Sequence, residues 1–545
     1  MKFKIHNGLA CLFVIGALGG CSSTSNNQNK KIFNLNLDQG LTSLDPAFAR
    51  NQNVLWMCNQ IFNGLVQIDD SLQLKPCIAK SWDISPDGKI YTFHLRKDVY
   101  FHDDVLFKNG KGRKVVASDF LYSFGRLIDP KIASSGSWIF SDKIKDKNSF
   151  IAQNDSTFII KLKTPFPPFL AMLSAQYCSV VPKEVAEKYG KEFRTHPVGT
   201  GPFKFKYWKE GEVLALVKNE NYFEFDESGK QLPYLDAVKA TFLPDKQTAF
   251  MEFLKKNLDF YNGVDGSYRD DILSKNGLLT AKYHGKFKIH IGPYLNTEYV
   301  GILVDTTLAI VKSSPLKYKK VRQAINYAID RKKMIKYLRN NIGTAANSGF
   351  IPLGMPGFDA AKVKGYVYDL PKAKQLLADA GFANGTNMPE IKLCSSTSTK
   401  DLMEFIQGEL SKIGIKCKVE VSQNASLRET IAKKQVNFFR GSWIADYPDG
   451  EIYLSMFYTK NFVPNGPNYT SFSNKKFDAL FVNLSFAKTN SERYELYQQM
   501  DQIMMNESPV VVLYYDKLVN LYQNNISGLG QNAQNLLVLK NAVKR

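Results

Sequence analysis

The stretch that decides the fold reads KPCIAKSWDISPDGKIYTFHLRKDVYF and covers residues 75–101. Over residues 90–96 the side chains alternate between two faces: Tyr91, Phe93 and Leu95 on one, and Thr92, His94 and Arg96 on the other. Alternation of apolar and polar residues with period two is typical of a β-strand with one buried face. The stretch therefore predicts a half-buried strand.

Segments with helical spacing lie among strands of this kind. Ser118 precedes apolar residues at positions 120, 121, 124, 127 and 128, which predicts a helix with Ser118 as its N-cap. Further helices are indicated by Val321, Ile325, Ala328 and Ile329, by Pro371 with Gly381 at the end, and by the capping-box pair Thr489 and Glu492. Pro509 then starts the strand VVVLYY. The predicted fold class is mixed α and β (α/β), in several lobes.

Composition limits the classes of function. The chain has 545 residues, with 71 Lys and Arg against 51 Asp and Glu, so its formal net charge is +20. Its length suits two to four domains, and its apolar fraction of 44% is typical of a globular protein. A positive charge can indicate a nucleic-acid or anionic-membrane partner. Because no arginine-rich run or nucleic-acid module appears, we expect a solvated, lysine-rich surface and no nucleic acid.

The N-terminal residues predict export. Lys2 and Lys4 precede an apolar run, residues 9–18, that is too short to span a bilayer, as in a signal peptide. The segment ends in LGGC, which resembles the lipobox of bacterial lipoproteins, with Cys21 as the lipidated residue. We expect residues 1–20 to be the signal and 21–31 a polar tether. The alternative is an ordinary signal peptide cleaved nearby, with Cys21 incidental.

The remaining cysteines predict no metal site. Five follow Cys21, an odd number, so at least one thiol stays unpaired. No CxxC occurs, which argues against zinc and thioredoxin-type chemistry. Cys394 and Cys417 lie in two strand-like runs around a helical segment. A disulfide between them is an open alternative, but we expect buried free thiols.

The sequence contains no convincing catalytic motif. It has no HExxH or GxSxG, and the GxGxxA match at residues 528–533 follows no βαβ unit. His102, Asp103 and Asp104 have the residue types for a metal site or an activated nucleophile, but we expect a solvated loop. The prediction is a protein that is not an enzyme, with no cofactor and no metal.

Three stretches together resemble one family. SLDPA, IFNGLVQID and the opening stretch run from Ser43 to Phe101; VGTGPFKFKYWKEGEVLALVKNENYF begins at Val198; and VRQAINYAIDRKKMIKYLRNNIGTAANSGFIPLGMPGF covers residues 321–358. Their order is similar to that in the oligopeptide- and dipeptide-binding proteins of ABC importers, the bacterial extracellular solute-binding proteins of family 5. The resemblance covers roughly Thr42 to Leu539.

That resemblance implies a two-lobed periplasmic-binding-protein-like fold, with an extra domain in one lobe, that closes about a hinge. It divides the chain into lobe I (32–75, 198–295 and 509–545), the extra domain (76–197) and lobe II (296–508). It also implies peptides as ligands and the permease subunits of an ABC transporter as partners. With the lipobox, we expect a monomer anchored to a bacterial membrane in the cell envelope, facing the periplasm or exterior.

The resemblance places the ligand site on residues 437–447, NFFRGSWIADY, which lie against the bound peptide like a partner strand in the family. It implies that Asp446 pairs with the peptide's α-ammonium, Trp443 walls the first side-chain pocket, and Arg440 can meet the carboxylate of a longer peptide. Tyr447 belongs to the same segment. Trp138, from the other lobe, is expected to stack on the ligand.

Each of these residues has a structural alternative, and so does the function. Asp446 can cap the turn at residues 447–450, Trp443 can be core, and Arg440 can be a surface residue. Members of the same family also bind nickel chelates, haem or sugars. The remaining alternative is an exported, lipid-anchored hydrolase.

Overall fold

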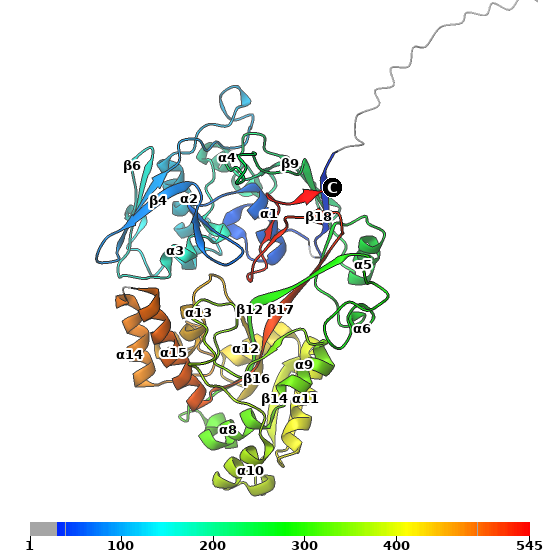
Figure 1. Cartoon of the computed structure of the whole chain (residues 1–545). Helices are drawn as coiled ribbons and strands as arrows, with labels where there is room; N and C mark the ends of the chain where they lie inside the picture. Colours follow the sequence, from blue (N-terminus) through cyan, green and yellow to red (C-terminus); the bar gives the residue numbers. More distant parts are fainter. Residues whose placement is uncertain (1–29, 39, 488) are drawn as a thin grey trace, which may run out of the picture.

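The computed structural model describes residues 30–38, 40–487 and 489–545. Two lobes lie one above the other in Figure 1, joined by the long strands β12 and β17. The first half of the chain forms most of the upper lobe, and the C-terminal segment returns to it. The predicted signal peptide, tether start and Cys21 lie outside the described residues. Within the described part, no helix is both long enough and apolar enough to cross a membrane.

One mixed sheet of eleven strands runs through both lobes. In spatial order its strands are β15 (Cys417–Ser422), β14 (Ile391–Ser396), β16 (Phe438–Ile444), β12 (Lys288–Ile302), β17 (Val510–Tyr522), β11 (Phe260–Asn262), β1 (Ile32–Asn36), β10 (Ala237–Thr241), β9 (Val213–Lys218) and β8 (Phe203–Lys209), with β13 (Thr344–Ala345) paired to β17.

The two crossing strands pair antiparallel along nearly their whole length, from Lys288 opposite Tyr522 to Gly301 opposite Val510. The register shifts between Pro293 and Thr297 and again between Glu298 and Tyr299. Such irregularities bend and twist a strand locally. Both register shifts lie where the chain passes from one lobe to the other. This part of the sheet therefore connects the two lobes.

A second sheet lies in the upper lobe, and residues 75–101 contribute its first two strands. Its strands are β4 (Ala79–Ile84), β5 (Ile90–Leu95), β7 (Thr157–Lys161) and β6 (Phe150–Asn154), in that spatial order. Tyr91, Phe93 and Leu95 are buried, which confirms the predicted strand. The sheet packs against α2 (Ala117–Ile128) through edge-to-face rings of Phe124 with Phe150 and Phe158.

The helices follow the predicted segments, with one correction. Ser118 lies inside α2 and is not its N-cap: the helix begins at Ala117, and Asp119 closes the first turn by accepting from the Val116 amide (2.9 Å). The other α-helices are α1 (Gln52–Ile61), α3 (Phe169–Met172), α4 (Lys183–Tyr189), α5 (Lys246–Leu254), α6 (Arg269–Ile272), α7 (Ala309–Lys312), α8 (Lys319–Ala328), α9 (Arg331–Arg339), α10 (Leu370–Asp379), α11 (Lys400–Ser411), α12 (Asn424–Ala432), α13 (Glu451–Leu454), α14 (Lys475–Asn483) and α15 (Asn490–Glu507).

The Gly199–Gly201 turn packs directly on the end of α1. A Cβ atom at Gly199 would lie 2.1 Å from the Ile61 carbonyl oxygen, and one at Gly201 would lie 2.5 Å from that of Gln60. His102 is buried behind the same turn, with Nε2 2.9 Å from the Gly201 carbonyl oxygen. Burial lowers the pKa of His102 to about 4, so this imidazole is neutral and structural. The metal or nucleophile interpretation of residues 102–104 therefore finds no support.

The cysteines after Cys21 are all free thiols in the described chain. Cys394 lies on β14 and Cys417 begins β15, on the two predicted strands around α11, with no disulfide between them. Burial raises the pKa of the Cys417 thiol to about 12, which suits a residue that packs rather than reacts.

Candidate ligand-binding site

The predicted segment forms β16 and the turn after it, and part of that strand has an open edge. On one side β16 pairs with β12 throughout, from Phe438 opposite Ile302 to Ile444 opposite Asn296. On the other side β14 pairs with it only at Phe438 and Phe439. In the described structure no strand covers that edge of residues 440–444. An open edge of this kind can bind an extended ligand through main-chain hydrogen bonds.

Asp446 follows this open edge and its carboxylate is unpaired. No hydrogen bond or ion pair joins it to another described residue, and its side chain is accessible to solvent. Protein atoms nevertheless crowd around it, and this desolvation raises the pKa of Asp446 above its ordinary value. Burial raises the pKa of Tyr177, and the negative charge of Asp446 adds to that increase.

The turn after Asp446 is capped by a different carboxylate. Asp449 Oδ1 accepts from the Glu451 amide at 3.0 Å, and Asp449 also pairs with Arg493. Tyr497 donates from its hydroxyl to Asp449 Oδ1 at 2.5 Å. Asp446 takes no part in this network. The turn-cap alternative for Asp446 is therefore not what the structure shows.

Tyr447 and Trp138 meet between the lobes. Tyr447 is buried and donates from its hydroxyl to Glu451 Oε2 at 2.5 Å. Burial raises the pKa of Glu451 to about 7. Trp138, from the upper lobe, stacks on the Tyr447 ring with centroids 6.1 Å apart. Two predicted site residues from distant parts of the sequence are thus brought into contact next to Asp446.

The SLDPA segment holds the loop that carries Trp138. Asp45 forms a buried, two-pronged ion pair with Arg126, at 2.6 and 3.1 Å. The Ala47 carbonyl accepts from Ser134 Oγ at 2.6 Å, and Ser134 Oγ in turn accepts from the Gly136 amide. These bonds fix the loop two residues before Trp138, so the first motif of the sequence positions an aromatic ring at the site.

Trp443 and Arg440 lie on opposite faces of β16. Trp443 is partly buried against the main core, and its indole Nε1 has no hydrogen-bond partner in the described structure. Arg440 is bound within the chain: its Nη2 lies 2.7 and 2.8 Å from the two carboxylate oxygens of Glu298. The structure therefore places Arg440 beside an acid of its own, whereas the surface alternative assumed a solvated side chain.

The buried carboxylate of Asp501 holds a loop that contacts β12. Asp501, on α15, accepts from the Phe350 and Ile351 amides at 2.7 and 3.2 Å. Burial raises the pKa of Asp501 to about 7. The loop that it holds contacts β12, since Thr297 Oγ1 donates to the Phe350 carbonyl at 2.9 Å. This loop positions the middle of β12 beneath the ligand segment.

Sequence reasoning missed Tyr177, Tyr453 and Glu298. Tyr453 donates from its hydroxyl to the Leu295 carbonyl (2.7 Å), which also accepts from the Ala445 amide (3.0 Å). Glu298 lies 142 residues from its partner Arg440. No local pattern marks any of them. A separate cavity of about 250 Å³ in the upper lobe, lined by residues including Asn59, Asn63, Gln176 and Lys540, contains none of the predicted site residues.

Comparisons with known proteins place this geometry in context. The family model "Bacterial extracellular solute-binding proteins, family 5 Middle" matches residues 73–465. Heme-binding protein A of Haemophilus influenzae is 31% identical over 469 residues, which cover 83% of this chain and 80% of the relative. Glutathione-binding protein GsiB of Shigella dysenteriae serotype 1 is 26% identical, and the match covers 97% of both chains.

Solved structures share the fold over nearly the whole chain. HbpA2 from Haemophilus parasuis superposes with a TM-score of 0.81 at 23% identity, covering 95% of this chain and all of the other. The periplasmic binding protein DppA from Helicobacter pylori, in complex with the peptide STSA, superposes with a TM-score of 0.73 at 26% identity, covering 95% and 98%. The predicted two-lobed, mixed α and β binding-protein fold is confirmed.

Proposed function

We propose that this chain, which belongs to family 5 of the bacterial extracellular solute-binding proteins, captures short peptides by their free amino group. Membership makes it a solute-binding protein that works outside the cytoplasm and delivers its ligand to an ABC importer, in a family of binding proteins rather than enzymes. The identity of the ligand is the part that we propose.

The unpaired carboxylate of Asp446 carries the proposal. Desolvation raises the pKa of Asp446, so a cation beside it would favour its charged form, and an α-ammonium supplies that cation with three donors. The open edge of residues 440–444 offers main-chain groups that suit any peptide sequence. Trp138, Tyr447 and Trp443 supply aromatic walls for the first side chains.

Glutathione and haem are the competing ligands, because two relatives carry these names. Glutathione is a tripeptide with a free α-amino group, so it fits the same use of Asp446. Haem has no amine to pair with the unpaired carboxylate of Asp446. That carboxylate therefore favours an amine-bearing ligand.

The anchoring and the domain division complete the proposal. We propose that Cys21 is lipidated and that residues 22–31 tether the binding lobes to a bacterial membrane. We also propose the division into lobe I, the extra domain of residues 76–197, and lobe II. The long strands β12 and β17 support that division, because they contain or adjoin the expected boundaries at residues 295 and 509.

The test is the ligand that purified protein carries. Mass spectrometry of the denatured extract should reveal peptides or glutathione, and calorimetry with these compounds should show micromolar or tighter binding. N-acetylation of the ligand should weaken binding at least tenfold. A haem absorption band in the purified protein, with no peptide and no effect of acetylation, would contradict the proposal.

A further inference from the structure

Arg440 is already bound to a carboxylate of its own chain. Glu298 lies on β12 opposite Ser442, two residues along β16 from Arg440, so both side chains extend from the same face of the sheet. Both carboxylate oxygens of Glu298 accept from Arg440 Nη2, at 2.8 and 2.7 Å. Glu298 is buried and Arg440 is partly buried, so little water competes with this pair.

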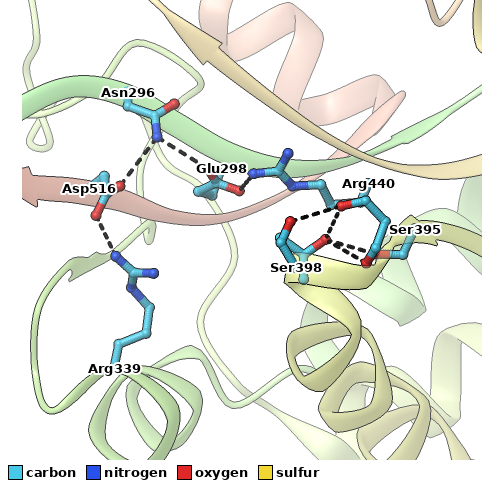
Figure 2. A network of polar contacts seen from close by, with 9 residues as sticks. Asn296, Glu298, Arg339, Ser395, Ser398, Arg440 and Asp516 are labelled. Carbon is cyan, nitrogen blue, oxygen red and sulfur yellow. Dashed lines mark hydrogen bonds and ion pairs between the residues drawn. The ribbon is translucent and has the colours of Figure 1, made fainter. Parts of the chain in front are cut away.

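The pair belongs to a cluster of four charges, Arg440, Glu298, Asp516 and Arg339, shown in Figure 2. Asn296 joins its two halves: Nδ2 donates to Glu298 Oε1 at 3.1 Å and to Asp516 Oδ2 at 3.3 Å. Arg339 Nη2 donates to Asp516 Oδ1 at 2.6 Å. Two cations therefore balance two carboxylates, and the four-charge cluster has no net charge to offer a ligand.

A ligand carboxylate at Arg440 would have to displace Glu298. The displaced carboxylate would remain buried without its cation, which is strongly unfavourable. It would also stay close to the second carboxylate, Asp516, since Asn296 bridges the two. A neutral ligand group at the same place leaves the cluster intact and incurs no such cost.

We propose that Glu298 is a specificity-determining residue, which occupies Arg440 from within and excludes solutes that place a carboxylate there. The inference rests on the proposed function, in which the solute lies along β16. It deepens that function by naming the ligand class. The ligands are peptides, short or longer, whose chemical group beside Arg440 is neutral. Affinity then depends on the amino end at Asp446 and gains nothing from a C-terminal carboxylate.

Paired peptides test this directly. Calorimetry compares a peptide bearing a free C-terminal carboxylate with its C-terminal amide. Wild-type protein should bind the carboxylate peptide no more tightly than its amide, whereas Glu298→Gln should prefer the carboxylate by about tenfold or more. The double variant Glu298→Gln/Arg440→Gln should lose that preference. A wild-type preference of tenfold or more that Arg440→Gln abolishes would overturn the proposal.

A second measurement needs no peptide. Sodium acetate, exchanged for sodium chloride at constant ionic strength, should raise the thermal midpoint of Glu298→Gln by about 2 °C and leave wild type unchanged. The double variant Glu298→Gln/Arg440→Gln is the matched control, because it removes the carboxylate together with the arginine that would bind acetate; acetate should not stabilise it. An equal acetate response in wild type would overturn the inference.

The two measurements separate the inference from the function beneath it. Suppose that no peptide binds any variant, while acetate stabilises Glu298→Gln alone. The peptide function is then wrong, but the inference that Glu298 occupies Arg440 is supported. If Glu298→Gln does not fold, the double variant Glu298→Gln/Arg440→Gln serves instead, because it leaves neither charge unpaired. It should not lower the affinity for the carboxylate peptide relative to the amide, and a selective loss of carboxylate binding would contradict the proposal.

Discussion

The rings of Trp138 and Tyr447 stack across the two lobes, with centroids 6.1 Å apart and planes 24° from parallel. Burial raises the pKa of Glu451, and the positive charge of Lys143 across this boundary partly opposes that increase. The stacked pair therefore belongs to the contact between the lobes, and Tyr447 directly follows Asp446 in the chain.

Trp138→Ala should weaken ligand binding by about 3- to 10-fold, because an aromatic pair contributes roughly 0.5 to 1.5 kcal/mol beyond its buried area. Calorimetry with the extracted ligand measures the change. Trp82→Ala, in the four-stranded sheet of the same lobe, serves as the control and should leave the dissociation constant unchanged. Equal losses in both variants would show that the effect is general destabilisation.

Asp446→Asn should weaken binding of a free-amine peptide by about 2 to 4 kcal/mol, roughly 30- to 1000-fold, since it removes one partner of a desolvated charge pair. The fold should be unaffected, because Asp446 bonds to no described side chain. N-acetylating the peptide should cost wild type a similar amount. The two changes together should cost much less than their sum. Additive losses by calorimetry would mean that Asp446 does not meet the amine.

Cys21→Ser should yield a protein that folds and binds its ligand but is released from the membrane. Binding belongs to the lobes, which begin after the polar segment, whereas the anchor depends on one thiol. Fractionation of cells followed by mass spectrometry of the N-terminus measures both properties. A variant that still fractionates with membranes as a lipidated species would contradict the lipobox interpretation.

Gly199→Ala should destabilise the protein by about 3 kcal/mol or more, because the new Cβ atom would lie 2.1 Å from the Ile61 carbonyl oxygen. The Ile61 carbonyl group is backbone and cannot turn aside, and Phe62 Cδ1 lies only 2.7 Å from the same Cβ position. Gly125→Ala, inside α2 with nothing within 4 Å of its added Cβ, should instead stabilise by about 0.5 to 1 kcal/mol. Urea unfolding of both variants measures the contrast.

Asp501 predicts a pH dependence of stability. Its folded pKa of about 7 lies above the unfolded value of roughly 3.9, so its contribution is fully present below pH 4 and is lost as pH rises toward 7. Asp501→Asn should therefore remove roughly 2 to 4 kcal/mol of pH dependence over that range. Urea unfolding at pH 5 and pH 7 measures the slope. Glu429→Gln, at an exposed acid whose pKa is lowered, should keep the wild-type slope.

Local signals in the sequence predicted the elements of the fold well. The capping box at Thr489 and Glu492 is formed, with both bonds at 3.2 Å, and the alternation over residues 90–96 became β5. The Ser118 cap failed because Asp119 closes the turn from within the helix, a competition between neighbours that residue type alone does not decide.

The site needed more than local signals. The resemblance led to Asp446, Tyr447 and Trp138, but it could not reveal that Arg440 is paired, because Glu298 reaches it only through the register of β12 on β16. Partners of this kind are set by sheet order, and no spacing along the chain encodes them.

The continuity of the main sheet has a mechanical consequence. Since β12 and β17 hydrogen-bond to strands of both lobes, the lobes cannot slide past each other without breaking the ladder. What remains is torsion: the two strands can wind or unwind, most easily where the register breaks between Pro293 and Thr297. The resistance to twisting of β12 and β17 then depends on a few backbone positions in these two strands. It does not depend on the size of the lobes that the strands connect.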